Sequence, residues 1–182
     1  MPPSPRYGLW LRHLHWLTAA LVVVAIALAE LHHYAPRGSA LRSGAMYAHT
    51  QFGLAALLVL LPRLLLRLAG RTPPVEPPLP RWQHAAARLV HVVLYALLLA
   101  LPVLGMLVYQ ANGRVQDFLG LPLPALIAPN HDLVRPIEVI HIQLGDLLLW
   151  LAAAHAASAL WHHWGRRDTT LRRMGYGGRR AS

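Results

Sequence analysis

Residues 138–163, EVIHIQLGDLLLWLAAAHAASALWHH, form a long apolar segment with two histidines, His141 and His155, inside it. A helix needs about 20 apolar residues to cross the hydrocarbon layer of a membrane, which is about 30 Å thick. This segment is therefore predicted to span the membrane. Three more apolar segments meet the same length requirement, at about residues 12–32, 47–68 and 86–109.

These four segments make up most of a chain of 182 residues that is 55% hydrophobic. They predict an all-α integral membrane protein, a single four-helix bundle over residues 1–182. The first segment is expected to be retained and not cleaved as a signal peptide, because it is long and no small-residue cleavage site follows it.

Arginine placement predicts the orientation, because short arginine-rich loops stay on the cytoplasmic side. Arginines concentrate in the N-terminus, the second connection and the tail, namely Arg6, Arg12, Arg63, Arg67, Arg71, Arg81, Arg166, Arg167, Arg172, Arg173, Arg179 and Arg180. The first and third connections hold four arginines and four acidic residues: Arg37, Arg42, Arg114, Arg135, Glu30, Asp117, Asp132 and Glu138. We therefore expect both termini in the cytoplasm and the protein in a bacterial inner membrane.

The formal net charge of +10 is explained by this topology, so nucleic acid is not an expected partner. The chain has no cysteine, which excludes iron–sulfur clusters and thiolate zinc sites. Any bound metal must be held largely by histidine.

Five of the twelve histidines lie within or at the mouth of an apolar segment, where ionisable groups are costly and usually functional: His15, His49, His91, His141 and His155. On an ideal helix His141 and His155 are about 21 Å apart along the axis and only about 40° apart around it. The fourth helix thus offers two imidazoles on one face at two depths. With the predicted orientation, His15 reaches the depth of His155 and His49 reaches the depth of His141.

Two imidazoles facing each other across a bundle are the axial ligands of a low-spin haem. Zinc would usually need a third or fourth protein ligand at each level. A haem also needs space beside its ligands, and a small residue follows each of these four histidines by one turn: Ala19, Gly53, Gly145 and Ala159. His91 is followed by Tyr95 instead, but its depth leaves it as an alternative to His15.

Several short motifs give the chain a family resemblance over nearly its whole length: LHWL, HTQFG followed by PRLLLRL, LYALLLALPVLGMLVY, and HAASALWHH with DTTLRRM. In order and spacing they resemble the bacterial di-haem cytochrome b561 family, which includes superoxide oxidase. The resemblance implies a four-helix membrane bundle with two b haems. It also implies that the ligands match His15, His49, His141 and His155, the set already reached from spacing.

The resemblance further implies an oxidoreductase that takes electrons from periplasmic superoxide, which becomes oxygen, and passes them to ubiquinone. We expect the quinone near His162 and His91, at the cytoplasmic depth. Arg63 and Arg67 match a basic pair of the family and are expected to meet haem propionates. Arg37 and Arg42 are the candidates for steering an anionic donor.

Two other functions fit the same sequence. Similar histidine spacing occurs in the cytochrome b anchor subunits of hydrogenases and dehydrogenases. A haem-free transporter that passes a metal ion along its histidines is the second alternative. The loops are too short to dock a large partner, which favours a self-contained enzyme with no obligate protein partner. The equal numbers of arginines and acids in the outer loops weaken the case for superoxide in particular.

Overall fold

The computed structural model describes residues 6–70 and 72–175, so Arg71, Arg179 and Arg180 lie outside the described residues. Its long elements are four helices: α1 (Leu9–Tyr34), α2 (Ala40–Ala69), α3 (Arg81–Ala111) and α4 (His131–Trp164). Shorter elements are the strands β1 (Asp117–Phe118) and β2 (Leu121–Pro122), which pair antiparallel, and the helix α5 (Thr170–Met174). Each long helix contains one predicted apolar segment and extends beyond it at both ends.

The four long helices are long and apolar enough to cross a membrane, with 26 to 34 residues each. Their outward faces carry large apolar side chains, such as Val23, Leu65 and Trp150, which are 66%, 68% and 73% exposed. In water such a surface would be unfavourable, whereas in lipid it matches its surroundings. The chain is therefore built as a four-helix membrane bundle.

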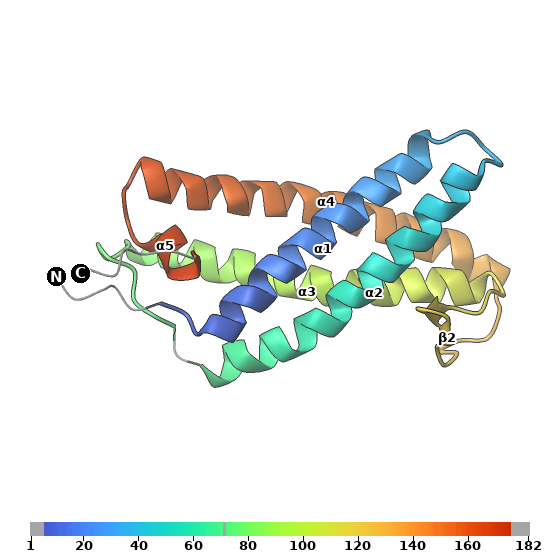
Figure 1. Cartoon of the computed structure of the whole chain (residues 1–182), viewed down its shortest axis with the longest axis horizontal. Coiled ribbons are helices and arrows are strands. Elements are labelled where there is room, and N and C mark those ends of the chain that lie inside the picture. The colour runs from blue at the N-terminus through green and yellow to red at the C-terminus, as the bar shows by residue number, and fades with distance from the viewer. Residues whose placement is uncertain (1–5, 71, 176–182) are drawn as a thin grey trace.

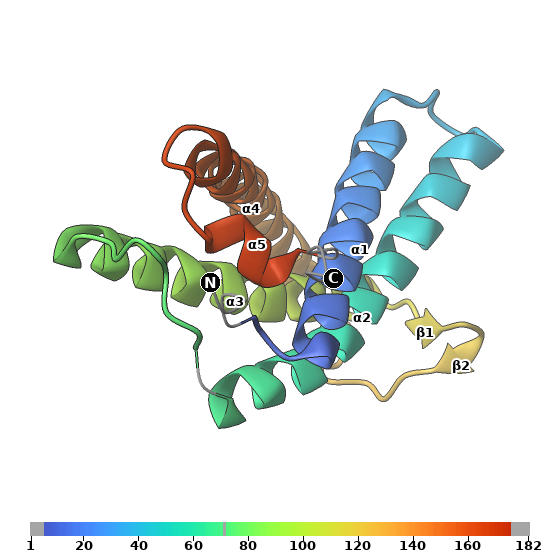
Figure 2. The same ribbon diagram turned by 60° about the vertical axis from the view of Figure 1, so that its left-hand side comes forward.

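The helices form two antiparallel pairs, α1 with α2 and α3 with α4, and packing within each pair is more extensive than packing between α2 and α3. Figure 1 shows that the α1–α2 turn and the β1–β2 hairpin lie at one end of the bundle, which we call the hairpin end. The α2–α3 linker and α5 lie at the other end, which we call the terminal end. Figure 2 shows α1 and α2 side by side, with α4 on the other side of the bundle.

The centre of the bundle is a small leucine cluster of Leu97 and Leu101 from α3 and Leu148 from α4. Leu148 lies halfway along α4 between His141 and His155. The buried cluster therefore separates the levels of the two histidines. Apolar packing between these levels fixes α4 against α3.

Side-chain hydrogen bonds fasten the hairpin end. Gln51 of α2 is buried and bonds to both sides of the strand turn, donating to the carbonyl of Asp117 at 3.0 Å and accepting from the amide of Leu119 at 2.8 Å. Gly120 takes a positive φ of 82°, which a residue with a side chain rarely adopts. Two-residue strands have no periodic pattern that sequence can reveal, and this hairpin was not predicted.

The short helix α5 closes the terminal end, and it too was not predicted from hydropathy. Main-chain and side-chain bonds join it to α1 and the residues before it: Tyr7 N to Arg173 O at 3.2 Å, Arg12 Nη1 to Gly175 O at 2.7 Å, and Trp16 Nε1 to Met174 O at 2.9 Å. Thr169 and Glu76 bond to each other through two bonds of 3.0 Å, which tie the residue before α5 to the α2–α3 linker. The segment after α4 is thus built into the bundle.

Candidate functional site

Four of the predicted histidines form two pairs in the bundle, each joining α4 to the α1–α2 pair. His49 of α2 and His141 of α4 have ring centroids 6.2 Å apart, with ring planes at 86°. Toward the terminal end, His15 of α1 and His155 of α4 have centroids 6.4 Å apart, with planes at 75°. The spacing along α4 therefore produces two facing pairs at two depths.

These separations match two imidazoles on opposite sides of one metal ion. A metal–imidazole bond is about 2.0–2.1 Å and a ring centroid lies about 1.1 Å from each ring nitrogen, so the two centroids should be about 6.2–6.4 Å apart. His91 and His155 are only 5.3 Å apart, too close for this arrangement. The geometry therefore favours His15 over His91 as the partner of His155.

The arrangement does not fit a metal site with three protein ligands. Across residues 6–70 and 72–175, no group of three or more His, Asp or Glu side chains is placed to hold a metal ion. Two imidazoles per site suit a metal whose other ligands come from a macrocycle, as in haem.

The surroundings of the His49–His141 pair fit a haem in two respects, the hydrogen bond of His49 and the space beside two glycines. His49 Nδ1 lies 2.8 Å from the carbonyl oxygen of Ala25, which only accepts, so Nδ1 donates and Nε2 keeps a lone pair for a metal. A side chain added at Gly53 or Gly145 would meet nothing within 4 Å, which leaves space beside both histidines. Open space at these two positions is what a haem held by His49 and His141 would need.

Gly105 of α3 is a third glycine at this level, and the sequence reasoning missed it. A β-carbon at this position would lie 3.4 Å from Cε1 of the His141 ring. Gly105 thus lets the His141 ring rest directly on the α3 backbone. Its signal in the sequence is weak, since it differs from other glycines only in its neighbour across the bundle.

The His15–His155 pair lines a cavity of about 90 Å³ with residues from all four long helices, including Thr18, Ala19, Arg63, His91, Tyr95 and Ala152. Arg63 Nη2 lies 3.0 Å from His15 Nδ1, and the guanidinium carbon lies 5.1 Å from the centroid of the Tyr95 ring. Arg63 is therefore directed into the cavity from α2. Arg67, one turn further along, is half-buried and is not among the residues lining the cavity.

His162 lies at the end of α4, two turns beyond His155 and on nearly the same face. Its Nδ1 is 2.5 Å from Oδ2 of Asp168, a fully buried carboxylate that the sequence reasoning did not single out. Asp168 also accepts from the amide of Thr170 at 2.9 Å, and Arg166 Nε lies 3.8 Å from Oδ2. Burial raises the pKa of Asp168, but the hydrogen bonds from His162 and Thr170 outweigh this effect and hold the pKa below its usual value.

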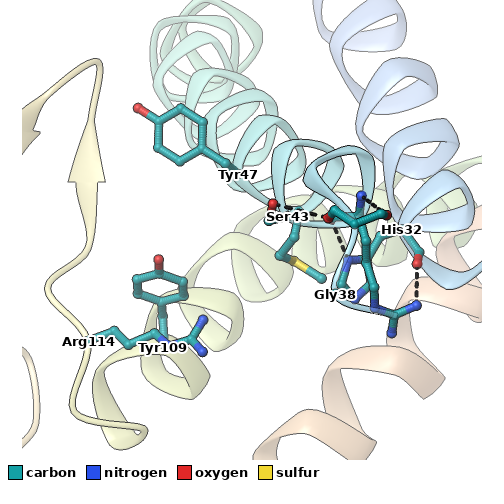
Figure 3. Close-up of a pocket in the computed structure, with 9 residues that line it drawn as sticks. His32, Gly38, Ser43, Tyr47, Tyr109 and Arg114 are labelled. Carbon is teal, nitrogen blue, oxygen red and sulfur yellow. Dashed lines mark hydrogen bonds between the residues drawn. The ribbon is translucent and has the colours of Figure 1, made fainter. Parts of the chain in front are cut away.

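A second cavity, of about 350 Å³, opens at the hairpin end, and we call it the hairpin-end cleft (Figure 3). Its polar lining comes from the end of α1, the α1–α2 turn, α2, the end of α3 and the segment that follows α3: His32, Ser39, Arg42, Ser43, Tyr47, Tyr109 and Arg114. Met46, which also lines it, precedes His49 by one turn of α2. The cleft therefore reaches to within one turn of His49 along α2.

The arginines at the hairpin end differ in what they contact. Arg42 Nη1 lies 2.7 Å from the carbonyl of His32, 3.3 Å from that of His33 and 3.2 Å from that of Ala35, so it caps the C-terminal end of α1. Arg37 is exposed in the turn. Arg114, which the sequence reasoning counted only as a loop charge, lies with its guanidinium carbon 5.5 Å from the Tyr109 ring centroid.

Known proteins with the same pattern identify the family. The model for prokaryotic cytochrome b561 matches residues 6–177. The chain belongs to the prokaryotic cytochrome b561 family. The chain is 35% identical over 162 residues to "Cytochrome b561 homolog 1" of Escherichia coli (strain K12), covering 89% of this chain and 92% of that protein.

This cytochrome b561 is similar to two further relatives over most of its length. It is 32% identical over 161 residues to "Probable superoxide oxidase CybB" of Yersinia pestis, covering 88% of this chain and 90% of that protein. It is also 29% identical over 180 residues to "Cytochrome b561 homolog 2" of Escherichia coli (strain K12), covering 93% and 90%. Membership in the cytochrome b561 family implies b-type haem, and the facing histidines fit that group.

Proposed function

We propose that this cytochrome b561 holds two b haems, one between His49 and His141 and one between His15 and His155. The proposal rests on the two centroid separations of 6.2 and 6.4 Å, which match two imidazoles on opposite sides of one iron. Haems held by these four histidines would supply one-electron transfer.

We propose that Arg63 pairs with a propionate of the haem at the His15–His155 level. In the structure its guanidinium donates to His15 Nδ1 at 3.0 Å. If His15 held a haem through Nε2, its Nδ1 would carry the hydrogen and could not accept from Arg63, whose guanidinium would then be available to pair with an anion at the same level. A haem propionate is such an anion, and Arg67 on the next turn is proposed to assist.

The orientation we propose puts the terminal end in the cytoplasm. The support is the number of arginines there: Arg6, Arg12, Arg63, Arg67, Arg81, Arg88, Arg166, Arg167, Arg172 and Arg173 among the described residues. The hairpin end then faces the periplasm of a bacterial inner membrane. The two histidine levels provide a route for electrons across the membrane.

The reaction we propose is superoxide oxidation coupled to ubiquinone reduction. Superoxide gives up an electron at the hairpin end, where the lining of the hairpin-end cleft comes within one turn of His49 on α2, and leaves as oxygen. Ubiquinone takes up electrons at the terminal level, beside His155, where His91 lines the cavity. The relative named as a probable superoxide oxidase supports the choice of donor.

The experiment combines a spectrum with fast kinetics. Purified protein should show two haem b per chain by pyridine haemochrome, and stopped-flow absorbance should show haem reduction by superoxide followed by reoxidation by a ubiquinone analogue. A protein without haem would point to the metal-transporter alternative. A haem protein that superoxide fails to reduce, and that purifies with a larger catalytic subunit, would be an anchor subunit instead.

A further inference from the structure

The two histidines at the His49–His141 level differ in what their Nδ1 atoms contact. His49 Nδ1 lies 2.8 Å from the carbonyl oxygen of Ala25, and this bond leaves Nε2 as the nitrogen with a lone pair. His141 Nδ1 is buried and forms no hydrogen bond with any of the described residues. A buried ring nitrogen without a partner is costly, so the position of the His141 ring requires an explanation.

The His141 ring lies against the backbone of α3 at Gly105. A β-carbon at position 105 would lie 3.4 Å from Cε1 and 3.8 Å from Nδ1 of this ring. The Cε1–Nδ1 edge of the ring therefore faces the backbone at this position. Any other residue type would place a side chain between this edge and the helix.

A backbone acceptor lies on the same part of α3. The carbonyl of a helical residue points toward the residue four positions later, so the carbonyl of Leu101 points toward Gly105. This carbonyl interacts with the His141 ring, although it forms no hydrogen bond with Nδ1 in this structure. A carbonyl oxygen has two lone pairs, and the helix uses only one of them. Without a side chain at position 105, the second lone pair is open to the ring.

We propose that Gly105 is the positioning residue for His141 as a haem ligand, and that it acts by leaving the Leu101 carbonyl open to accept the Nδ1 hydrogen. This inference rests on the proposed function. Nδ1 of His141 would then donate to a carbonyl as Nδ1 of His49 does, and its Nε2 would keep a lone pair for iron. Backbone carbonyls of two different helices, α1 and α3, would thus orient the two ligands at this level.

This hydrogen bond would have a measurable effect on the redox potential. An imidazole whose Nδ1 hydrogen is donated to a carbonyl is a more basic ligand and favours oxidised iron, so loss of the bond raises the midpoint potential. Opening the site to water has the opposite effect, because water stabilises the additional positive charge of oxidised iron. The direction of the change therefore separates loss of the bond from general loosening of the site.

The test places side chains at position 105 of the haem-loaded protein. Gly105→Val adds two methyl groups beyond a β-carbon that already touches the ring, and valine in a helix is largely confined to one rotamer. The haem at the His49–His141 level should show a higher midpoint potential and bind about 10–100-fold more weakly, measured by transfer to apomyoglobin. The other haem should keep its potential. Ala96→Val, at an exposed position of α3, is the matched control and should change neither haem.

Gly105→Ala decides the question if the valine variant holds no haem at this level. Its β-carbon would only touch the ring, at 3.4 Å, so both haems should stay bound and the potential should rise by less than in Gly105→Val. Titration in a His15→Ala background, which should hold only this haem, assigns the potential to it. A potential that stays at the wild-type value or falls, in either variant, would overturn the inference. Wild-type protein without two haems would overturn the proposed function instead.

Discussion

His15 and His155 face each other with ring centroids 6.4 Å apart, although they come from the first and the last of the four long helices. His91 approaches the same His155 ring to 5.3 Å from α3. One histidine thus has two neighbours at one depth, and only the His15 separation fits a metal between the rings.

The first prediction follows from this difference. His15→Ala or His155→Ala should reduce the haem content from two to one per chain, and His49→Ala or His141→Ala should remove the other haem. His91→Ala is the matched control and should keep both. Pyridine haemochrome content and the reduced spectrum measure the outcome. Two haems in His15→Ala together with one in His91→Ala would exchange the roles of these residues.

The second prediction concerns space beside the His49–His141 pair. Gly53→Leu and Gly145→Leu should exclude the haem at this level, because each glycine faces open space that a leucine side chain would fill. Gly44→Leu, on α2 outside this level and also without close neighbours, should bind haem normally. Haem content of membrane-inserted protein is the measurement. Normal binding in both site variants would mean that the haem lies elsewhere.

The third prediction distinguishes Arg114 from Arg42, the two arginines that line the hairpin-end cleft. Arg114→Gln should slow haem reduction by superoxide about two- to fivefold at low salt and weaken the salt dependence, because screening acts over about 8–10 Å. Arg135→Gln, an exposed arginine paired with Glu138 at 3.1 Å, controls for net charge. Equal effects of the two substitutions would assign the steering to overall charge.

Arg42→Gln should act through structure as well as charge. Three carbonyls at the end of α1 lose their capping group, so the α1–α2 turn should exchange its amide hydrogens faster. Hydrogen exchange of residues 32–43 measures this effect. Arg37→Gln, in the same turn, should leave the exchange unchanged.

The fourth prediction concerns acid stability of the terminal end. The pKa of Asp168 is lowered from 3.8 in the folded protein, so its contribution to stability is fully present above about pH 3.8 and is lost as the pH falls through the folded-state value. Residues 165–175 should therefore become more accessible to protease in acid. Asp168→Asn should be accessible at neutral pH and nearly independent of acid. A wild-type segment that stays protected below this range would contradict the assignment.

The sequence was sufficient to predict four long apolar helices and the facing histidine rings, because both follow from regular geometry. Apolar length identifies a span, and fourteen positions along α4 fix the relation of His141 to His155. The helices extend beyond the predicted spans because their polar ends continue the hydrogen-bonded ladder outside the hydrocarbon.

Features that depend on contacts between distant segments were not predictable. Arg42 and Arg114 are both loop-side arginines in the sequence, and only the fold shows that one caps a helix while the other lies over an aromatic ring. In the sequence Asp168 is one polar residue in a basic tail. Only the fold shows that it is buried and accepts a hydrogen bond from the first residue of α5. Gly105 gains its role only from His141 on the facing helix.

The two antiparallel pairs, α1 with α2 and α3 with α4, are joined at both histidine levels by side chains that would share a haem. Two prosthetic groups would then act as cross-links between the two helix pairs. Assembly would become a maturation step limited by cofactor supply, and unassembled chains would present polar histidines to lipid or to membrane proteases. The amount of this cytochrome in a cell should accordingly follow the cell's capacity to synthesise haem.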